Sequence, residues 1–332
     1  MPFHLPQADL QPPEAPAAAG AVPQLLTGAQ LLAWRRSMLA VPGSGPASAA
    51  ALDWLLDLAG GLSMASLQML WLHPERQAQL ACPLASLEQL WRRHRGSDEP
   101  LQYLVGRCPW RDLELDVGPG VLIPRQETEL LIDLALSLAP HPPPGQPRLW
   151  ADLGTGSGAL AIALARAWPG SEGLAVETSS AALQLASLNL ARERQSHSGA
   201  AHGGAAPARV QLLQGDWWQA IRPWWGRLQL VVSNPPYIPS ATLAGLDPVV
   251  RDHEPSLALD GGSDGLSALR TIIAGASEAL APGGVLLLEH HHDQSAAVQA
   301  LLAQAGARAQ EAHRDLEGVL RFASARWGEP LP

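Results

Sequence analysis

The sequence contains no lysine, and its 22 basic residues are all arginine. They are outnumbered by 31 acidic residues, so the formal net charge is −9. Proteins that grip long nucleic acids through the phosphates need clustered basic charge, and this balance argues against that class. Phenylalanine and tyrosine are also scarce, with two of each beside 12 tryptophans. We attribute both biases to compositional drift and not to function.

Long apolar runs and cysteines are scarce as well. No stretch approaches the roughly 18 uninterrupted apolar residues of a membrane-spanning helix, so we expect no membrane association. Two cysteines, Cys82 and Cys108, are too few for a disulfide framework or a metal site. We therefore expect inert thiols in a cytoplasmic protein. The length of 332 residues, 47% of them hydrophobic, allows two domains with real cores.

The N-terminal third of the chain has helical signals. Residues 1–24 are rich in Pro and Ala and lack the basic and apolar regions of a signal peptide, so we interpret them as a disordered tail. Beyond them, apolar spacing and capping residues such as Thr27 and Ser63 predict a small helical bundle without strands. The expected helices are 28–40, 49–59, 63–73 and 87–95.

The remainder of the chain changes to alternating elements. The stretch 101–116 and the following Gly118-Pro119-Gly120 turn predict a β-hairpin, and a helix is expected over 127–139. Strands and helices then alternate, which predicts a doubly wound, mostly parallel sheet. The expected strands are 148–153, 173–177, 210–214, 228–233 and 285–289, the clearest helices are 158–168 and 180–194, and 196–208 is interpreted as a loop insertion.

Three successive strands are followed by groups that could hold a ligand. A Gly-x-Gly-x-Gly loop from Asp152 to Gly158 joins the first strand to a helix, where backbone can approach a ligand closely. Alone, it could serve a dinucleotide, S-adenosylmethionine or only a tight turn. Glu177 ends the next strand, and a carboxylate there can accept both hydroxyls of a ribose. Asp216 and Trp217 follow the third strand and could bracket an adenine.

The fourth strand ends in Asn234-Pro235-Pro236-Tyr237. The two prolines fix φ and remove two backbone donors, so the carbonyls there stay free to accept hydrogen bonds. An amide, free carbonyls and an aromatic face suit a planar NH2-bearing substrate, either a carboxamide or an exocyclic base amine. All four strands thus end in ligand groups at the carboxyl edge, where open α/β sheets bind ligands.

These motifs resemble those of class I methyltransferases that modify planar amino groups, and the flanking segments narrow the resemblance. The segments 99–106 (EPLQYLVG), 123–129 (IPRQETE), 238–239 (IP) and 254–266 (EPSLALDGGSDGL) resemble the HemK/PrmC family. That family comprises the protein-(glutamine-N5) methyltransferases of peptide chain release factors. The resemblance covers roughly residues 27–325.

The chain departs from the family pattern at two places. Glu177 stands where the family usually has Asp, and its longer side chain can still reach a ribose. His290, His291 and His292 follow Glu289 where the family usually has a glycine. Adjacent residues of a strand point to opposite faces, so these histidines would chelate a metal poorly. We expect a solvated strand end and no metal.

The resemblance implies both the architecture and the activity. A class I, Rossmann-like methyltransferase domain with a seven-stranded sheet would span 125–332, after a linker with a β-hairpin over 99–124. A helical domain over 25–98 would dock the substrate. The implied reaction is methyl transfer from S-adenosyl-L-methionine to the N5 amide nitrogen of the glutamine in the Gly-Gly-Gln motif of release factors. We expect a monomer without stable nucleic-acid binding.

The resemblance also implies roles for the motif residues. The Asn234 side-chain oxygen and the Pro235 carbonyl would accept from the two hydrogens of the substrate amide, and Tyr237 would pack on the amide plane. Arg125 and Glu254 could shape the substrate edge or form a structural ion pair. The implied catalytic and substrate-binding residues are Asn234, Pro235, Pro236 and Tyr237. The implied cofactor-binding residues are Asp152, Gly154, Thr155, Gly156, Ser157, Gly158, Glu177, Asp216, Trp217 and Asn234.

Other functions stay open at this point. An N6-adenine nucleic-acid methyltransferase would share the motif at Asn234, although the acidic net charge counts against it. A glutamine methyltransferase of a ribosomal protein is a second alternative, and the segments 123–129 and 237–239 favour the release-factor enzyme. The intact Asn234 and glycine loop argue against a non-catalytic scaffold. Nothing supplies the proton relay of an NAD-dependent oxidoreductase.

Overall fold

The computed structural model describes residues 22–40, 46–197 and 206–328. The chain divides into two compact units, Met1–Arg107 and Cys108–Pro332, which are described separately. Most of the expected disordered tail at 1–24, and most of the expected loop insertion at 196–208, lie outside the described residues.

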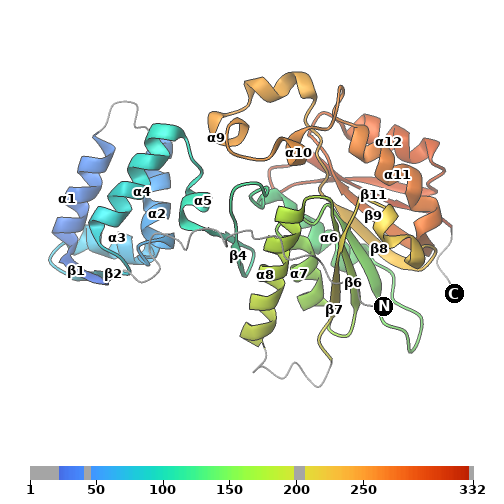
Figure 1. Ribbon diagram of the computed structural model, residues 1–332, viewed down its shortest axis with the longest axis horizontal. Helices are drawn as coiled ribbons and strands as arrows, with labels where there is room; N and C mark the ends of the chain where they lie inside the picture. The colour runs from blue at the N-terminus through green and yellow to red at the C-terminus, as the bar shows by residue number, and fades with distance from the viewer. Residues whose placement is uncertain (1–21, 41–45, 198–205, 329–332) are drawn as a thin grey trace. The chain divides into compact units, whose positions relative to one another are not determined.

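The first unit is the expected helical bundle with an unexpected small sheet (Figure 1). Strands β1 (Gln24–Thr27) and β2 (Gln77–Leu80) pair antiparallel, so the prediction of no strand in this region is wrong. Each strand has four residues, too few for the period-two pattern to be recognised, and their pairing joins distant parts of the chain. The helices are α1 (Gly28–Leu39), α2 (Pro46–Leu58), α3 (Met64–Leu72), α4 (Leu84–Ser97) and α5 (Leu101–Val105).

The stretch expected to lead into the hairpin as extended chain is instead the short helix α5. Four of its five side chains are buried, and Gly106 ends it in the left-handed region with φ of 74°. Packing against the bundle therefore outweighs the local alternation that suggested extended chain. The hairpin itself is present and shorter, formed by β3 (Arg107–Trp110) and β4 (Leu113–Asp116).

The second unit contains the seven-stranded sheet, in the order β10-β11-β9-β8-β5-β6-β7 (Figure 1). Strands β5 to β9 run parallel, while β11 pairs antiparallel with both β9 and β10. The sheet confirms the five expected strands and adds two that the sequence pattern did not reveal. The strands are β5 (Leu149–Leu153), β6 (Glu172–Glu177), β7 (Arg209–Gln214), β8 (Leu228–Ser233), β9 (Leu280–Glu289), β10 (Ala309–Arg314) and β11 (Leu320–Arg326).

Helices cover both faces of this sheet. One core packs α11 (Ser267–Ala279) and α12 (Ser295–Gln304) against the sheet, and the other packs α6 (Leu130–Leu138), α7 (Ala159–Ala167) and α8 (Ser180–His197). Adjacent residues of β5 belong to the two different cores, as strand alternation requires. Both faces of the central strands are thus buried, which explains their continuous apolar sequences. The shorter elements are η1 (Glu127–Glu129), η2 (Gln219–Trp224), η3 (Ser240–Gly245), α9 (Pro248–Arg251) and α10 (Ser256–Leu259).

Both cysteines are buried and unpaired. Burial raises the pKa of the Cys108 thiol to about 11, which disfavours the reactive thiolate. Across the described ranges, no helix is both long and apolar enough to cross a membrane.

Candidate active site

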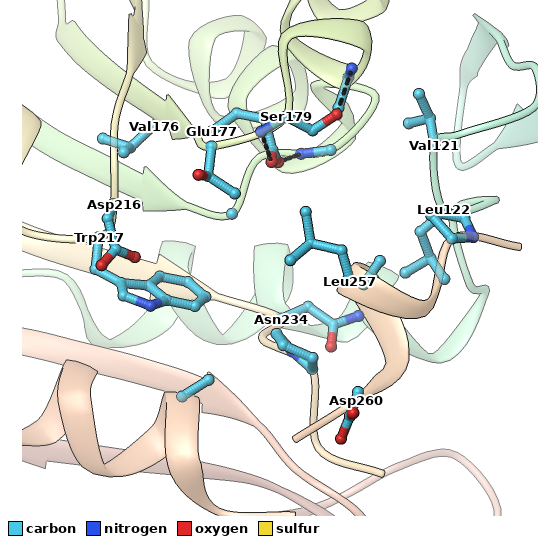
Figure 2. A pocket seen from close by; sticks show the side chains of 18 of the residues that line it. Val121, Leu122, Val176, Glu177, Ser179, Asp216, Trp217, Asn234, Leu257 and Asp260 are labelled. Atoms are coloured by element: carbon cyan, nitrogen blue, oxygen red, sulfur yellow. Dashed lines mark hydrogen bonds between the residues drawn. The ribbon is translucent and has the colours of Figure 1, made fainter. Parts of the chain in front are cut away.

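A cavity of about 430 Å3 lies at the carboxyl edge of the parallel strands (Figure 2). Its size falls within the usual range for small-molecule sites, about 300–1,000 Å3. Residues at or just beyond the ends of β5, β6, β7 and β8 all contribute to its wall. The expected site residues that line it are Gly154, Gly156, Glu177, Asp216, Trp217, Asn234 and Pro236.

The glycine loop reaches the cavity through its backbone. Gly154, Gly156 and Gly158 all have positive φ, at 75°, 56° and 87°, a region that other residues adopt only with strain. The Thr155 hydroxyl donates to the fully buried Asp152 carboxylate at 2.5 Å, and burial raises the pKa of Asp152 to about 7. Asp152, Thr155, Ser157 and Gly158 do not line the cavity, so these residues support the turn from behind.

Glu177 closes the same loop from β6. Its two carboxylate oxygens accept from the backbone N–H of Gly156 and of Ser179, each at 2.9 Å. Glu177 is buried, with 8% of the residue exposed. Each carboxylate oxygen has a second acceptor position. The carboxylate can therefore hold the loop and still accept from a ligand hydroxyl.

Trp217 has an unusual backbone for its size, with φ of 40°. Left-handed backbone at a bulky residue costs on the order of 1–2 kcal/mol and is often found at functional sites. The strained backbone brings the indole beside Gly154, where an added Cβ would lie 3.3 Å from the Trp217 Cζ3 atom. Glycine is thus favoured here by its φ, and the close approach of the ring leaves little room for a Cβ.

The four residues of the Asn234 motif are divided between the cavity and its support. Asn234 and Pro236 line the cavity, whereas Pro235 and Tyr237 are not among its lining residues. The Asn234 Nδ2 donates to the Thr128 hydroxyl at 2.9 Å, and the Tyr237 hydroxyl donates to Glu289 at 3.2 Å. Burial, more than any other cause, raises the pKa of Tyr237, so its hydroxyl stays protonated.

Part of the cavity wall was not predicted from the sequence. Segments far from the strand ends supply apolar side chains, with Val121 and Leu122 after the hairpin and Leu257 on α10 (Figure 2). Leu257 belongs to the family-like segment 254–266, and Val121 and Leu122 directly precede the segment 123–129, which is the only sequence signal that could have suggested a place in the site. Ser179, Ala182, Pro255, Ala258, Asp260, Ser267, Ala268 and Thr271 also line the cavity.

An ion pair ties these two segments together. Arg125 donates to the Glu254 carboxylate at 2.7 Å, and the backbone N–H of Ile123 donates to the other carboxylate oxygen at 3.2 Å. The Glu254 side chain is 1% exposed. Of the two interpretations of this pair, the structural one is observed, and neither residue lines the cavity.

Glu254→Ala is expected to lower the free energy of unfolding by about 2–4 kcal/mol, because it leaves Arg125 and a buried N–H without their acceptor. The loss is set below that of a fully buried pair because the Arg125 side chain is 31% exposed. Urea unfolding monitored by tryptophan fluorescence measures it. Asp252→Ala, which removes an exposed ion pair with Arg251, is the matched control and should change stability far less. Equal losses in the two variants would contradict the interpretation.

The prediction of a solvated strand end is wrong for His290, whereas His291 is partly exposed and His292 is exposed. His290 is fully buried, and its backbone N–H continues the ladder by donating to the Arg321 carbonyl at 2.9 Å. Its Nδ1 lies 2.8 Å from the His291 carbonyl, and the His291 Nδ1 lies 2.6 Å from Asp293. Within the part of the chain that the structure describes, no group of three or more His, Cys, Asp or Glu could hold a metal ion.

Comparison with known proteins agrees with this geometry. Residues 133–244 match the model of the family described as "Methyltransferase small domain". The catalytic domain of hMettl16, solved in complex with an RNA hairpin, aligns with a TM-score of 0.52 over 88% of this chain and 96% of that one. At 13% identity this likeness shows only the fold.

Relatives of much higher identity cover almost the whole chain. A protein of Prochlorococcus marinus named "Release factor glutamine methyltransferase" is 48% identical over 89% of this chain and 96% of its own length. A protein of Geobacter sulfurreducens with the same name is 36% identical over 92% of this chain and 99% of its own. Use of S-adenosylmethionine is a general property of such methyltransferases. The chain therefore belongs to the release factor glutamine methyltransferase family.

Proposed function

We propose that this protein transfers a methyl group from S-adenosyl-L-methionine to the N5 amide nitrogen of the glutamine in the Gly-Gly-Gln motif of peptide chain release factors. The observation that carries the proposal is that Asn234 shares one cavity with Glu177 and Trp217. A group suited to a planar amide thus lies beside groups suited to a nucleoside. The names of the relatives support a release factor as the substrate and do not favour the alternatives.

The residues of the cavity fit the methyl donor. Glu177 would accept from the ribose hydroxyls, Asp216 would accept from the adenine amine, and the Trp217 indole would lie beside the base. Gly154 and Gly156 would let the backbone approach the methionine part, since no side chain intervenes. When bound, the donor supplies a methyl group attached to a cationic sulfur. The sulfur is a good leaving group because it becomes neutral on losing the methyl group.

Asn234 would act on the acceptor. An amide nitrogen is a poor nucleophile because its lone pair is conjugated with the carbonyl. The Asn234 Oδ1 and the Pro235 carbonyl would accept from its two hydrogens, raise the electron density on nitrogen and aim the lone pair at the methyl group. Correct placement can supply several kcal/mol, within a ceiling of about 7–11 kcal/mol. The nitrogen then releases one proton to solvent, so no strong base is required.

The remaining expectations complete the proposal. The helical unit over 25–98 would dock the release factor, the segment 99–124 would link it to the methyltransferase domain at 125–332, and Tyr237 would pack near the acceptor amide. We further propose that the protein acts as a monomer in the cytoplasm, where translation factors are found.

Mass spectrometry of a release factor incubated with this protein and S-adenosylmethionine tests the proposal. We expect the mass of one added methyl group on the glutamine of the Gly-Gly-Gln motif. A release factor with alanine in place of that glutamine is the control and should gain nothing. Methylation of DNA or of a ribosomal protein, with none on the release factor, would overturn the proposal.

A further inference from the structure

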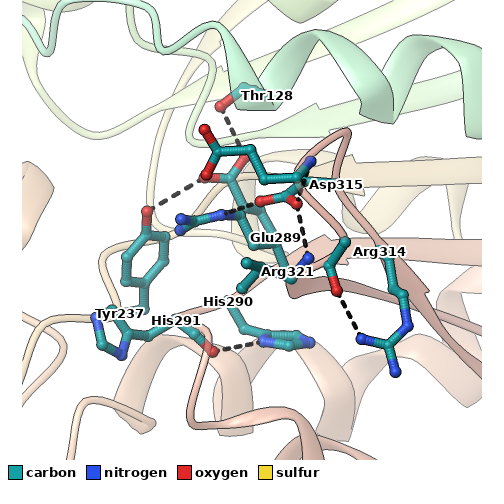
Figure 3. Close-up of polar contacts among 11 residues, drawn as sticks. Thr128, Tyr237, Glu289, His290, His291, Arg314, Asp315 and Arg321 are labelled. Carbon is teal, nitrogen blue, oxygen red and sulfur yellow. Dashed lines mark hydrogen bonds and ion pairs between the residues drawn. The ribbon is translucent and has the colours of Figure 1, made fainter.

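Behind the cavity wall, Glu289 accepts hydrogen bonds from Thr128 and Tyr237 (Figure 3), and a third bond joins Thr128 to Asn234. The Thr128 hydroxyl donates to Glu289 Oε2 at 2.6 Å and accepts from Asn234 Nδ2 at 2.9 Å. The Tyr237 hydroxyl donates to Glu289 Oε1 at 3.2 Å. Glu289 is 2% exposed and lies outside the cavity lining. None of the roles proposed above for the cavity residues involves this buried acid.

The direction of these bonds fixes the orientation of the Asn234 amide. An ionised carboxylate can only accept hydrogen bonds, so the single hydroxyl proton of Thr128 must be donated to Glu289. Thr128 can then only accept from Asn234, which turns the NH2 end of that amide toward Thr128. The oxygen end is left for the cavity, and no residue in the described ranges donates to it.

We propose that Thr128 and Glu289 are positioning residues for methyl transfer, which hold the oxygen end of the Asn234 amide toward the acceptor. This inference rests on the acceptor-binding role proposed above for Asn234. With the opposite orientation, the NH2 group of Asn234 would face the NH2 group of the substrate. Two donors cannot hydrogen-bond to each other, so the acceptor nitrogen would lose its alignment.

The orientation depends on the charge of Glu289. A protonated Glu289 would donate to the Thr128 oxygen, and the Thr128 proton would then be free to point at Asn234. The Asn234 amide would no longer be held in one orientation, because its oxygen could then accept from Thr128 while its NH2 group faced the cavity. The ionised form of Glu289 is therefore the active form.

The surroundings of Glu289 place this change near neutral pH. Burial raises the pKa of Glu289 from an ordinary value of 4.5 to about 7, although the bonds from Thr128 and Tyr237 oppose the shift. Glu127 on η1 also raises the pKa, and Arg321 on β11 lowers it. Since only the ionised form is active, the rate should be high above about pH 7 and fall as the pH drops through that value.

Three variants, Thr128→Val, Thr128→Ser and Glu289→Gln, are compared with the wild type to test the proposal. At saturating donor, kcat for release-factor methylation should fall on the order of 10- to 100-fold in Thr128→Val, as expected for one or two lost hydrogen bonds. The donor Kd should stay within about twofold, because no donor contact changes. Thr128→Ser restores the hydroxyl and should recover most of the lost rate. Thr242→Val, which removes an exposed hydroxyl bound to the Pro239 carbonyl, is the matched control.

The pH profile separates positioning from a purely structural role. Glu289→Gln cannot titrate, so its kcat at saturating donor should lack the fall near pH 7 that the wild type shows. Asp152 also has a pKa near 7, raised by burial, but it supports the donor loop, and saturating donor suppresses its contribution. An unchanged fall in Glu289→Gln, or a wild-type kcat in Thr128→Val, would overturn the inference while leaving the proposed function intact.

A second readout needs no acceptor protein. The side-chain NH2 signals of Asn234, identified by their absence in Asn234→Asp, should shift in NMR spectra as the pH passes through about 7. The shift should be absent in Glu289→Gln. If the wild type methylates no release factor, the proposed function fails. These signals then still test whether Glu289 and Thr128 orient the Asn234 amide. Signals that do not respond to pH in the wild type would overturn the inference.

Discussion

Asn234→Ala is expected to abolish methyl transfer while leaving binding of S-adenosylmethionine largely intact. The change removes the oxygen that would accept from the substrate amide, without touching Glu177 or Trp217 on the donor side of the cavity. Aligned polar groups are worth about 10²–10³-fold in kcat at comparable sites, and lost alignment of the nucleophile adds to that. We therefore expect kcat to fall by at least about 1,000-fold, which is a larger effect than for any change behind the wall.

Two measurements separate chemistry from binding in this variant. Single-turnover transfer of labelled methyl to release factor gives the rate, and isothermal titration calorimetry gives the donor Kd, which should change less than about threefold. Asn234→Asp is the matched variant, because it keeps the shape and the acceptor oxygen but replaces the NH2 group that donates to Thr128 with a second oxygen. It should retain more activity than Asn234→Ala. A near-normal kcat in Asn234→Ala would remove Asn234 from the mechanism.

The strand ends of this site were predictable because their signals are local. Each of the expected strands is a short apolar run, and the residues that follow it are fixed to the carboxyl edge by the direction of a parallel sheet. Glu177, Trp217 and Asn234 therefore meet in one cavity, as their positions along the chain suggested. The pattern could not reveal β10, whose residues are largely exposed, or α5, whose helical form depends on packing against the bundle.

The residues that support the site from behind the cavity wall could not be predicted from the sequence, for a different reason. Thr128 and Glu289 are 161 residues apart, and neither has a neighbour in sequence that indicates a buried hydrogen bond. Leu257 lines the cavity three residues after Glu254, whose carboxylate accepts from Arg125, 129 residues away along the chain. Contacts of this kind follow from the tertiary fold and not from local pattern. Sequence thus identified groups that could touch ligands, whereas the structure identifies what orients them.

The second large effect is expected at Glu177. Glu177→Ala removes the acceptor of two backbone N–H groups and of the proposed ribose hydroxyls. Hydrogen bonds to a charged group contribute about 1.5–3 kcal/mol each, so we expect the donor Kd to rise by about 100-fold or more. The donor Kd of Glu177→Gln should be intermediate. In the wild type both carboxylate oxygens accept an N–H, whereas an amide can accept with only one atom.

Calorimetric titration with S-adenosylmethionine measures these changes, and two further variants locate their cause. Glu172→Gln alters the same residue type at the other end of β6, away from the cavity, and should leave the Kd unchanged. Glu177→Asp introduces the acid usual in this family and should stay within about tenfold of the wild type, since both oxygens and the charge are kept. If Glu177→Ala bound the donor as tightly as Glu172→Gln does, Glu177 would have no part in holding the donor.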